Sequence, residues 1–266
     1  MTKLIAEIGW NHMGNMVLAK DMITAAKDSG ADFAKFQTFD IKRLKSGPWD
    51  TDGRREIYEK AQLSLDNHFD LKNYCDEVGI GFMSSVFSIG DADLLKQVVT
   101  DYVKIPSMES RNRELIHYCL KHFKHLIIST GTSTYDEIRS IVVNIPKDRY
   151  TLLHCVSSYP CKFDVVNLPR INNLKDLSDS VGFSDHTQGI ETSVLSLGYD
   201  IKWIEKHFTT NNDLPGRDNE FAVLPKELKR LSEYIKISEE VMNYKGCDYQ
   251  KCETDSREIY GGRWNG

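Results

Sequence analysis

The feature that most constrains the fold is a repeated alternation of short apolar runs with longer segments of helical spacing. Consecutive apolar pairs such as Leu152-Leu153 indicate strands that are buried on both faces, as in a parallel sheet covered by helices. The eight expected strands are Lys3–Gly9, Asp32–Thr38, Gly81–Val86, Tyr102–Ile105, Leu126–Thr130, Thr151–Val156, Val181–Ser184 and Ile201–Phe208. We therefore predict an α/β fold, a closed (β/α)8 TIM barrel; an open doubly wound sheet is the alternative.

Helix ends and the C-terminal region refine this prediction. Gly30, Gly79 and Gly198 each stand between a helical segment and a strand, where we expect the left-handed conformation that glycine adopts without strain. Proline suits a first helical turn, so the last helix is expected to begin at Pro225. Its buried face is expected to contain Leu228, Leu231, Ile235 and Met242. We predict a barrel domain over residues 1–244, followed by a tail or truncated linker over residues 245–266.

Composition excludes several classes of protein. The net charge of −5 provides no basic surface for nucleic acid or for a membrane, and we expect to find neither partner. No apolar run has the length of a membrane span, and no signal peptide is recognisable, so we expect a cytoplasmic protein. The six cysteines form no CxxC pair and are expected to be free and mostly buried, although Cys247 and Cys252 could bridge or bind metal.

Polar residues gather where the expected strands end, which is the face of a (β/α)8 barrel that carries the chemistry. One set combines two lysines with a series of hydroxyls, a donor set that suits a phosphate or a carboxylate. Its members are Lys35, Lys104, Ser85, Ser107, Ser129, Ser157 and Ser184. Serines at strand ends also cap helices, and that is the alternative interpretation of each serine taken alone.

A second set consists of His186 and His207, which end neighbouring strands. Two imidazoles in these positions can converge on one divalent metal and leave coordination sites open for water and substrate. Asp185 or Glu205 could orient one of these imidazoles, unless strand alternation directs them elsewhere. We interpret His12 and His154, two further histidines near strand ends, as structural.

Two carboxylates, Glu7 and Glu109, are expected at the same rim, where either could act as a general acid or base. Lys35 or Lys104 could instead form a Schiff base, which leaves an aldolase as an alternative. The long connection from Asp40 to about Leu65 has the length of a lid or a binding loop.

Several segments together resemble the sialic acid synthases. The similarity runs in order over roughly residues 4–230, through the segments that contain IAEIGWNHMG, KFQT, KIPSME, STG, HCVSSYP, GFSDHT and IEKHFT. It implies a (β/α)8 barrel that condenses phosphoenolpyruvate with an N-acyl hexosamine such as N-acetylmannosamine. The products would be phosphate and a sialic-acid-type nine-carbon 2-keto acid. Enzymes of this family are often dimeric, so a homodimer is a further expectation.

The resemblance also implies roles for individual residues. His186 and His207 would hold Mn²⁺ or Mg²⁺, and Glu7 and Glu109 would contact the reacting oxygens. Phosphoenolpyruvate would be held by Lys35, Lys104, Ser107, Ser129 and Ser184, with Ser85 and Ser157 nearby. Gln37, Tyr159 and Asp218 would face the sugar.

The sequence departs from this family pattern in three places. Members of the family commonly continue into an antifreeze-like domain that supplies an arginine to the sugar site, a role that Arg217 or an arginine of the tail would have to take here. Asn219-Glu220 follows Asp218 where a histidine is usual, and Ser85-Val86 and Ser157-Ser158 differ from the commonest phosphate-side residues. Two further alternatives remain open: another phosphoenolpyruvate-condensing barrel, or a catalytically inactive sugar-phosphate binding barrel.

Overall fold

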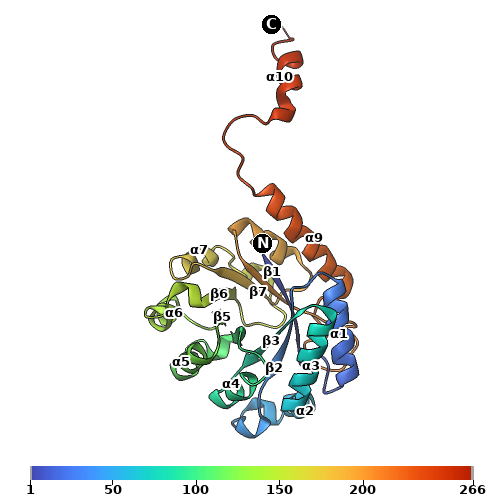
Figure 1. The fold of residues 1–266 in the computed structure, drawn as a ribbon, viewed down its shortest axis with the longest axis vertical. Coiled ribbons are helices and arrows are strands. Elements are labelled where there is room, and N and C mark those ends of the chain that lie inside the picture. Colours follow the sequence, from blue (N-terminus) through green and yellow to red (C-terminus); the bar gives the residue numbers. More distant parts are fainter. Residues whose placement is uncertain (1, 265–266) are drawn as a thin grey trace.

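The computed structural model describes residues 2–264 and consists of a closed eight-stranded barrel surrounded by helices (Figure 1). All neighbouring strands are parallel and follow chain order, with β8 pairing back to β1. The strands are β1 (Lys3–Gly9), β2 (Phe33–Thr38), β3 (Gly81–Val86), β4 (Tyr102–Ile105), β5 (His125–Ser129), β6 (Tyr150–Cys155), β7 (Val181–Asp185) and β8 (Trp203–His207). The predicted (β/α)8 barrel is therefore confirmed, and the predicted strand ends differ from the observed ones by two residues at most.

Helices lie between successive strands, and most are short. They are α1 (Met16–Asp28), α2 (Arg54–Ala61), α3 (Leu65–Val78), α4 (Ile89–Leu95), α5 (Arg113–His122), α6 (Tyr135–Val142), α7 (Arg170–Lys175), α8 (Glu191–Ser196), α9 (Pro225–Val241) and α10 (Thr254–Tyr260). Short 3-10 helices span Ile41–Arg43, Pro48–Asp50, Ser107–Glu109, Lys147–Arg149, Phe163–Val165, Leu197–Tyr199 and Lys251–Glu253. None of the helices within residues 2–264 has the length and apolar character needed to cross a bilayer.

Local sequence explains several helix boundaries. The Asn15 side chain accepts hydrogen bonds from two amides of the first turn of α1, which satisfies donors that have no partner inside the helix. Gly30 and Gly79 adopt positive φ values of 87° and 75°, as expected. The expectation for Gly198 is wrong, because Asp200 is the left-handed residue in that connection, with a φ of 49°.

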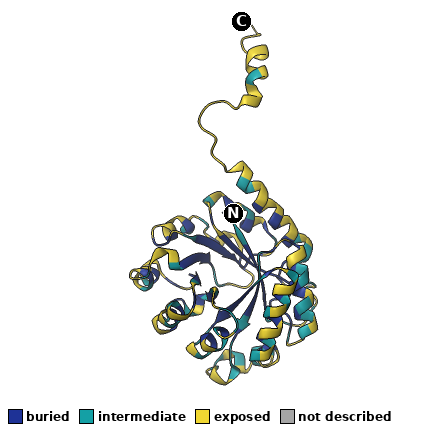
Figure 2. Ribbon diagram, viewed as in Figure 1, coloured by how far each residue is buried: buried dark blue, intermediate teal, exposed yellow. Residues whose placement is uncertain are grey.

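The apolar core has two parts. The larger one fills the space between the outer faces of the strands and the helices, so buried strands lie inside a ring of helices whose outer faces are exposed (Figure 2). The smaller one fills the barrel interior and contains Ile5, Met83, Ile127, Leu153 and Trp203. Phe33 and Tyr102 pack against this interior cluster. The barrel is thus closed by side chains below the carboxyl ends of its strands, as expected for eight strands.

The helix α9 begins at Pro225, as predicted, and buries Leu228, Leu231 and Ile235. The expectation for Met242 is wrong: α9 ends at Val241, and the Met242 side chain is 58% exposed. From this point the chain leaves the barrel and ends in the short helix α10, which projects away from it (Figure 1). All six cysteines are free, and only Cys247 and Cys252, both in this segment, are exposed.

Candidate active site

A layer of charged and hydroxyl side chains lies inside the barrel directly above the apolar plug. Alternate residues of a strand face the same side, so the inward positions that follow Phe33 on β2 and Trp203 on β8 are Lys35 and Glu205. Both side chains are buried. The same alternation places Gln37 and His207 one step further toward the carboxyl ends of these strands.

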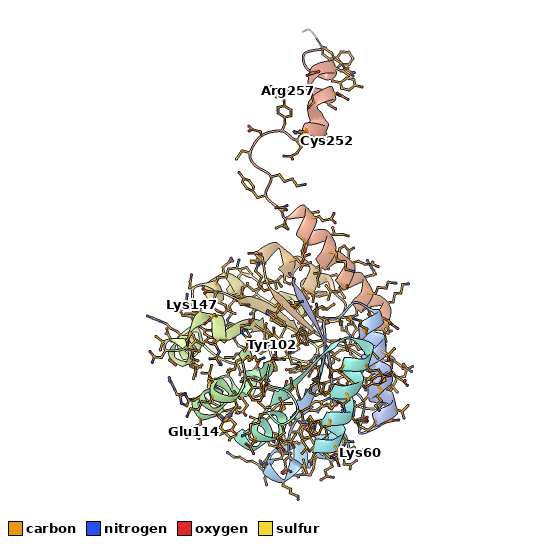
Figure 3. All side chains as sticks on the ribbon, viewed as in Figure 1. Lys60, Tyr102, Glu114, Lys147, Cys252 and Arg257 are labelled. Atoms are coloured by element: carbon orange, nitrogen blue, oxygen red, sulfur yellow. The ribbon has the colours of Figure 1, made fainter. Side chains whose placement is uncertain are left out.

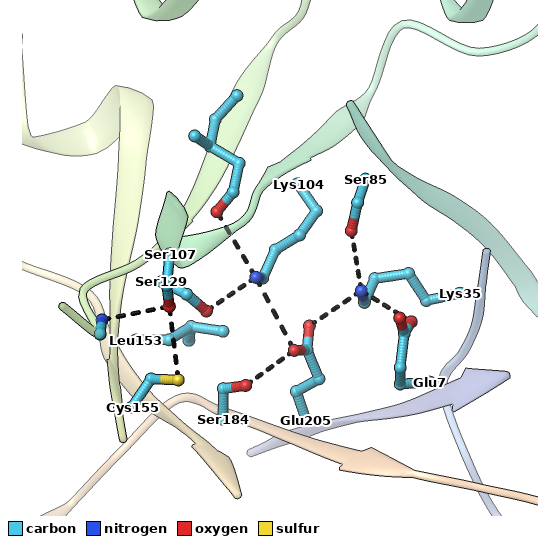
Figure 4. Close-up of polar contacts among 12 residues, drawn as sticks. Glu7, Lys35, Ser85, Lys104, Ser107, Ser129, Leu153, Cys155, Ser184 and Glu205 are labelled. Atoms are coloured by element: carbon cyan, nitrogen blue, oxygen red, sulfur yellow. Dashed lines mark hydrogen bonds and ion pairs between the residues drawn. The ribbon is translucent and has the colours of Figure 1, made fainter. Parts of the chain in front are cut away.

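The two lysines lie on either side of the Glu205 carboxylate (Figure 4). Lys35 Nζ is 2.7 Å from Glu7 Oε2, 2.9 Å from Ser85 Oγ and 3.4 Å from Glu205 Oε2. Lys104 Nζ donates to Ser129 Oγ at 2.7 Å and lies 3.7 Å from Glu205 Oε1. Burial opposes the charge on Lys35, but the carboxylates of Glu205 and Glu7 outweigh it and raise the pKa of the ammonium. The lysines therefore form a compact cationic centre that these two acidic groups balance.

The predicted serines join this centre and do not cap helices. Besides Ser85 and Ser129, Ser184 donates to Glu205 Oε1 at 2.8 Å, and Ser107 Oγ accepts from the Gly131 amide at 3.2 Å. Ser157 lines the same cavity. None of the five is the N-cap of a described helix. The arrangement gives an anion several short donors around two ammonium groups.

The sequence left open whether Glu205 orients an imidazole or is directed elsewhere by strand alternation, and the structure directs it toward the lysines. Its carboxylate faces both lysines, and their charges outweigh burial and lower its pKa well below the ordinary value. Asp185 does not orient an imidazole either. It faces outward between β7 and the helices and lies 3.0 Å from Lys206 Nζ. Strand alternation, counted from Trp203, is the signal that would have placed Glu205 inside the barrel.

The imidazoles of His186 and His207 lie together at the rim, with ring centroids 5.4 Å apart. His186 Nδ1 is 2.8 Å from the Val156 carbonyl oxygen, so Nδ1 donates this hydrogen bond and Nε2 is the ring nitrogen left to bind an ion. His207 Nδ1 is buried, makes no hydrogen bond and lies 3.5 Å from Asp218 Oδ2. Because metal–nitrogen bonds are about 2 Å long, one ion can reach both rings at this spacing.

Asp218 and Cys155 lie beside these two histidines but do not complete a metal site with them. Within residues 2–264, no group of three or more His, Cys, Asp or Glu side chains is arranged to hold a metal ion. An ion held here would take its other ligands from water and substrate, which is typical of catalytic sites. His12 and His154 do not line the cavity. His154 Nε2 bonds to the Val166 carbonyl and His12 Nδ1 accepts from the Gly14 amide, so both are structural as predicted.

The two candidate acid–base residues differ in their surroundings. Glu7 is buried; burial, together with the neighbouring Glu205 charge, outweighs Lys35 and raises the pKa of Glu7. Gln37 Nε2 donates to its other oxygen at 2.9 Å. Glu109 is half-buried in the 3-10 helix after β4 and accepts a hydrogen bond from Asn112 Nδ2 at 2.8 Å. Glu7 is therefore a carboxyl group whose surroundings favour proton uptake more than bulk water does.

The residues expected to face a sugar lie toward the opening. Tyr159 stacks on His186 with ring centroids 4.2 Å apart, and its side chain is 45% exposed. Asp218 is buried beside His207, and burial, reinforced by the charge of Glu7, raises its pKa to about 7. Arg217 lines the cavity, whereas Arg257 lies on the tail away from the barrel (Figure 3). Of the two candidates for a sugar-site arginine, Arg217 and an arginine of the tail, Arg217 is the one that lies at the cavity.

All fourteen predicted site residues line one cavity of about 950 Å³ at the carboxyl ends of the strands. The connection after β2, which was expected to be a lid or a binding loop, forms much of its wall through residues such as Phe39, Arg43, Trp49 and Tyr58. Cys155 also lines the cavity, with its Sγ 3.7 Å from His186 Nδ1. The structure thus brings the predicted residues together, while their individual roles stay predictions.

Comparisons with known proteins agree with this architecture. Residues 22–246 match the model of the NeuB family. The chain is 35% identical over 258 residues to N,N'-diacetyllegionaminic acid synthase of Campylobacter jejuni, an alignment that covers 91% of this chain and 77% of that protein. It is 28% identical to human N-acetylneuraminate-9-phosphate synthase, over 97% of this chain and 76% of the human protein.

Among solved structures, the crystal structure of N-acetylneuraminic acid synthetase from Leptospira borgpetersenii in complex with citrate superposes with a TM-score of 0.87. The sequences are 29% identical, and the match covers 98% of this chain and 92% of that one. The chain therefore spans about three quarters of the length of the two curated relatives and nearly all of this solved chain.

Proposed function

This chain belongs to the NeuB family, and the relatives compared above are enzymes named as synthases. We propose that it condenses phosphoenolpyruvate with an N-acyl hexosamine. The products are a sialic-acid-type nine-carbon 2-keto acid and phosphate. The observation that carries the proposal is that one cavity holds both a two-lysine cradle and a pair of imidazoles. The first suits an anionic enol ester, and the second suits an ion beside an aldehyde.

The lysine cradle binds phosphoenolpyruvate through its phosphate and carboxylate. Lys35 and Lys104 supply the charge, and Ser85, Ser107 and Ser129 supply short hydrogen bonds to oxygen. Four of these groups are fixed on strands and Ser107 lies in the short 3-10 helix after β4, so they stabilise the charge that shifts during attack without rearranging. Carbon 3 of phosphoenolpyruvate attacks the open-chain aldehyde, water adds to carbon 2, and the C–O bond to phosphate breaks.

Glu7 transfers protons during these reaction steps. Its buried carboxyl group has a raised pKa and lies 2.7 Å from Lys35 Nζ, next to the anion cradle. A carboxyl group with a raised pKa exchanges a proton more readily than an ordinary carboxylate, so Glu7 can pass a proton to the oxygen that develops on the former aldehyde and regain one from the water that adds to carbon 2. Gln37 holds the other Glu7 oxygen and so fixes the orientation of the carboxyl group.

A divalent ion fits the residues at the rim. His186 Nε2 and the His207 ring would hold it, and when bound it supplies Lewis acidity toward the sugar aldehyde and toward water. The charge of the site supports this assignment. Glu7 and Glu205 already balance the two lysines, so a highly charged anion needs additional positive charge in order to bind. We propose Mn²⁺ or Mg²⁺, both of which accept oxygen ligands from substrate and water.

The test measures phosphate release from phosphoenolpyruvate with a panel of N-acyl hexosamines, with and without a chelator. We expect phosphate release that requires both a sugar and a divalent ion, and a Lys104→Met variant that loses activity because the cradle loses one of its two cations. Phosphate release that persists in excess chelator would contradict the metal assignment. Binding of phosphoenolpyruvate without release under any of these conditions would favour a binding protein.

One observation bears on the Schiff-base alternative: burial lowers the pKa of Lys104, which favours the neutral amine that such chemistry needs. However, Lys104 Nζ is engaged with Ser129 and faces Glu205, contacts that suit an ammonium ion. Borohydride treatment in the presence of a carbonyl substrate separates the two mechanisms. A trapped lysine adduct would support the aldolase, and we expect none.

A further inference from the structure

Acidic and basic groups are nearly balanced around the cavity, with a slight excess of acidic ones. Among the described residues that line it, seven are Asp or Glu and six are Lys or Arg. Two of the basic residues, Lys35 and Lys104, lie in the cradle at the bottom. The other four lie nearer the opening and are Arg43, Lys45, Arg54 and Arg217. We call these four the mouth cations.

Two of the mouth cations, Arg43 and Arg54, form ion pairs with carboxylates of this chain. The Arg43 guanidinium lies 2.5 Å from Asp91 Oδ1 and 3.6 Å from Asp40 Oδ2. Arg54 binds Asp52 through Nη2 at 2.7 Å and also donates from Nε. These ion pairs satisfy the planar donor sets that otherwise bind phosphate.

The two other mouth cations, Arg217 and Lys45, are exposed. Arg217 interacts electrostatically with Asp218 and Asp52. Lys45 lies on the connection after β2. Glu220 lines the cavity on the same loop as Arg217, and Glu109 lies on the 3-10 helix after β4. A phosphate near this opening would therefore meet carboxylates as well as these two cations.

Aromatic side chains form two walls of the cavity. On one side, Tyr58 packs against Trp10 and Phe39 with ring centroids 5.1 and 5.9 Å apart. On the other side, Tyr159 and Phe221 lie 6.0 Å apart. All five residues line the cavity. Such surfaces suit the methyl groups of N-acyl substituents and the C–H faces of a sugar.

We propose that the sugar substrate is an uncharged N-acylated hexose and not a hexose phosphate, an inference that rests on the proposed condensation. A sugar phosphate could recruit Arg43 only by breaking its pair with Asp91, whose buried carboxylate would then lose its cationic partner. An uncharged sugar needs no such rearrangement. It places its acyl groups against the aromatic walls and leaves the ion pairs of the mouth intact.

The test compares kcat/KM for N-acetylmannosamine, its 6-phosphate and a 2,4-diacetamido trideoxyhexose at fixed phosphoenolpyruvate and metal. We expect an uncharged sugar to exceed the 6-phosphate by at least about ten-fold, roughly the effect of one unfavourable charge contact. Equal or better use of the 6-phosphate would overturn the inference and leave the proposed condensation intact.

A binding measurement separates the two proposals further. Calorimetric titration of the phosphoenolpyruvate-bound protein with the same sugars does not require turnover. Tighter binding of an uncharged sugar supports the inference, and tighter binding of the 6-phosphate overturns it. Absence of phosphate release with every sugar overturns the proposed function, whichever sugar binds.

Two variants test whether charge is the cause. Glu220→Gln removes a carboxylate from the opening, and Asp91→Asn frees Arg43 from its pair. Each should raise the ratio of kcat/KM for the 6-phosphate to that for N-acetylmannosamine by about three-fold or more. Glu240→Gln, on the exposed surface of α9, is the matched control and should leave this ratio unchanged. An unchanged ratio in both cavity variants would overturn the inference.

Discussion

At the scale of single residues, the chemistry depends on which buried acidic and basic groups form ion pairs with one another. Glu7, Lys35, Glu205 and Lys104 form a continuous series of ion pairs inside the barrel, and hydroxyl groups bind at its edges. Every member is buried, so replacing one side chain alters the charge balance of the others. Two predictions follow from this coupling.

The first prediction concerns Glu7. Glu7→Gln keeps the size of the side chain and its contact with Gln37 but cannot transfer a proton, so we expect kcat to fall about 10²–10⁴-fold, the usual contribution of a general acid or base. Steady-state phosphate release measures this, and KM for phosphoenolpyruvate should change far less. Glu109→Gln serves as the comparison, because a larger loss there would transfer the proton-shuttling role to Glu109.

The second prediction concerns Glu205, whose carboxylate faces both lysines and, together with Glu7, balances their charge. Glu205→Gln leaves two buried ammonium groups short of a partner, at a cost of about 3–5 kcal/mol, or a Tm lowered by roughly 6–10 °C. Inorganic phosphate should raise the Tm of this variant by more than it raises the Tm of the parent protein, because phosphate replaces the missing negative charge. Thermal unfolding with phosphate, against chloride at equal ionic strength, measures this. Equal phosphate effects on both proteins would refute the role of Glu205.

At the scale of elements, strands provide the cradle and loops provide the opening. The loop between β8 and α9 carries Arg217, Asp218, Glu220 and Phe221 to the cavity. Asn219, in the middle of this loop, is fully buried and does not face the cavity. Its side chain accepts a hydrogen bond from Thr209 Oγ1 and donates to the carbonyls of Pro215 and Asn11. Asn219 thus anchors the loop to the segments that directly follow β1 and β8.

The third prediction tests this anchor. Asn219→Ala removes three hydrogen bonds and loosens the loop without touching Lys35 or Lys104, so we expect KM for the sugar to rise by about ten-fold while KM for phosphoenolpyruvate stays within about two-fold. Steady-state kinetics with each substrate varied in turn measure the difference. A comparable rise in both KM values would show that Asn219 supports the whole barrel rather than this loop.

At the scale of the whole molecule, stability should depend on pH through buried neutral histidines. Burial lowers the pKa of both His12 and His154 to about 4 in the folded protein, whereas an unfolded chain titrates its histidines near 6.5. Between these values the unfolded state binds more protons than the folded state. The free energy of unfolding is therefore unaffected by these groups above about pH 6.5, and it falls as the pH is lowered toward 4.

The fourth prediction isolates one of these groups. His154→Gln keeps a donor for the Val166 carbonyl but cannot titrate, so the loss of stability between pH 6.5 and 4 should shrink by up to about 1.4 kcal/mol per pH unit. Urea unfolding at a series of pH values measures the slope. His117→Gln, on the exposed surface of α5, should leave the slope of the parent protein unchanged. The same slope in both variants would rule out His154 as a source of the pH dependence.

The sequence alone determined the barrel fold and the residues that lie at the carboxyl ends of its strands, because both follow from local rules. Hydrophobic periodicity and helix ends identify βα units, and eight parallel units bring all carboxyl strand ends to one face. The tertiary structure decided the rest: that Glu205 balances both lysines, that Asp185 faces outward to Lys206, that Asp200 and not Gly198 makes the left-handed turn, and that Arg43 is held by Asp91. Strand alternation can give the direction of a side chain such as Glu205, but the charged partner that it meets depends on contacts between distant segments, which residue spacing does not encode.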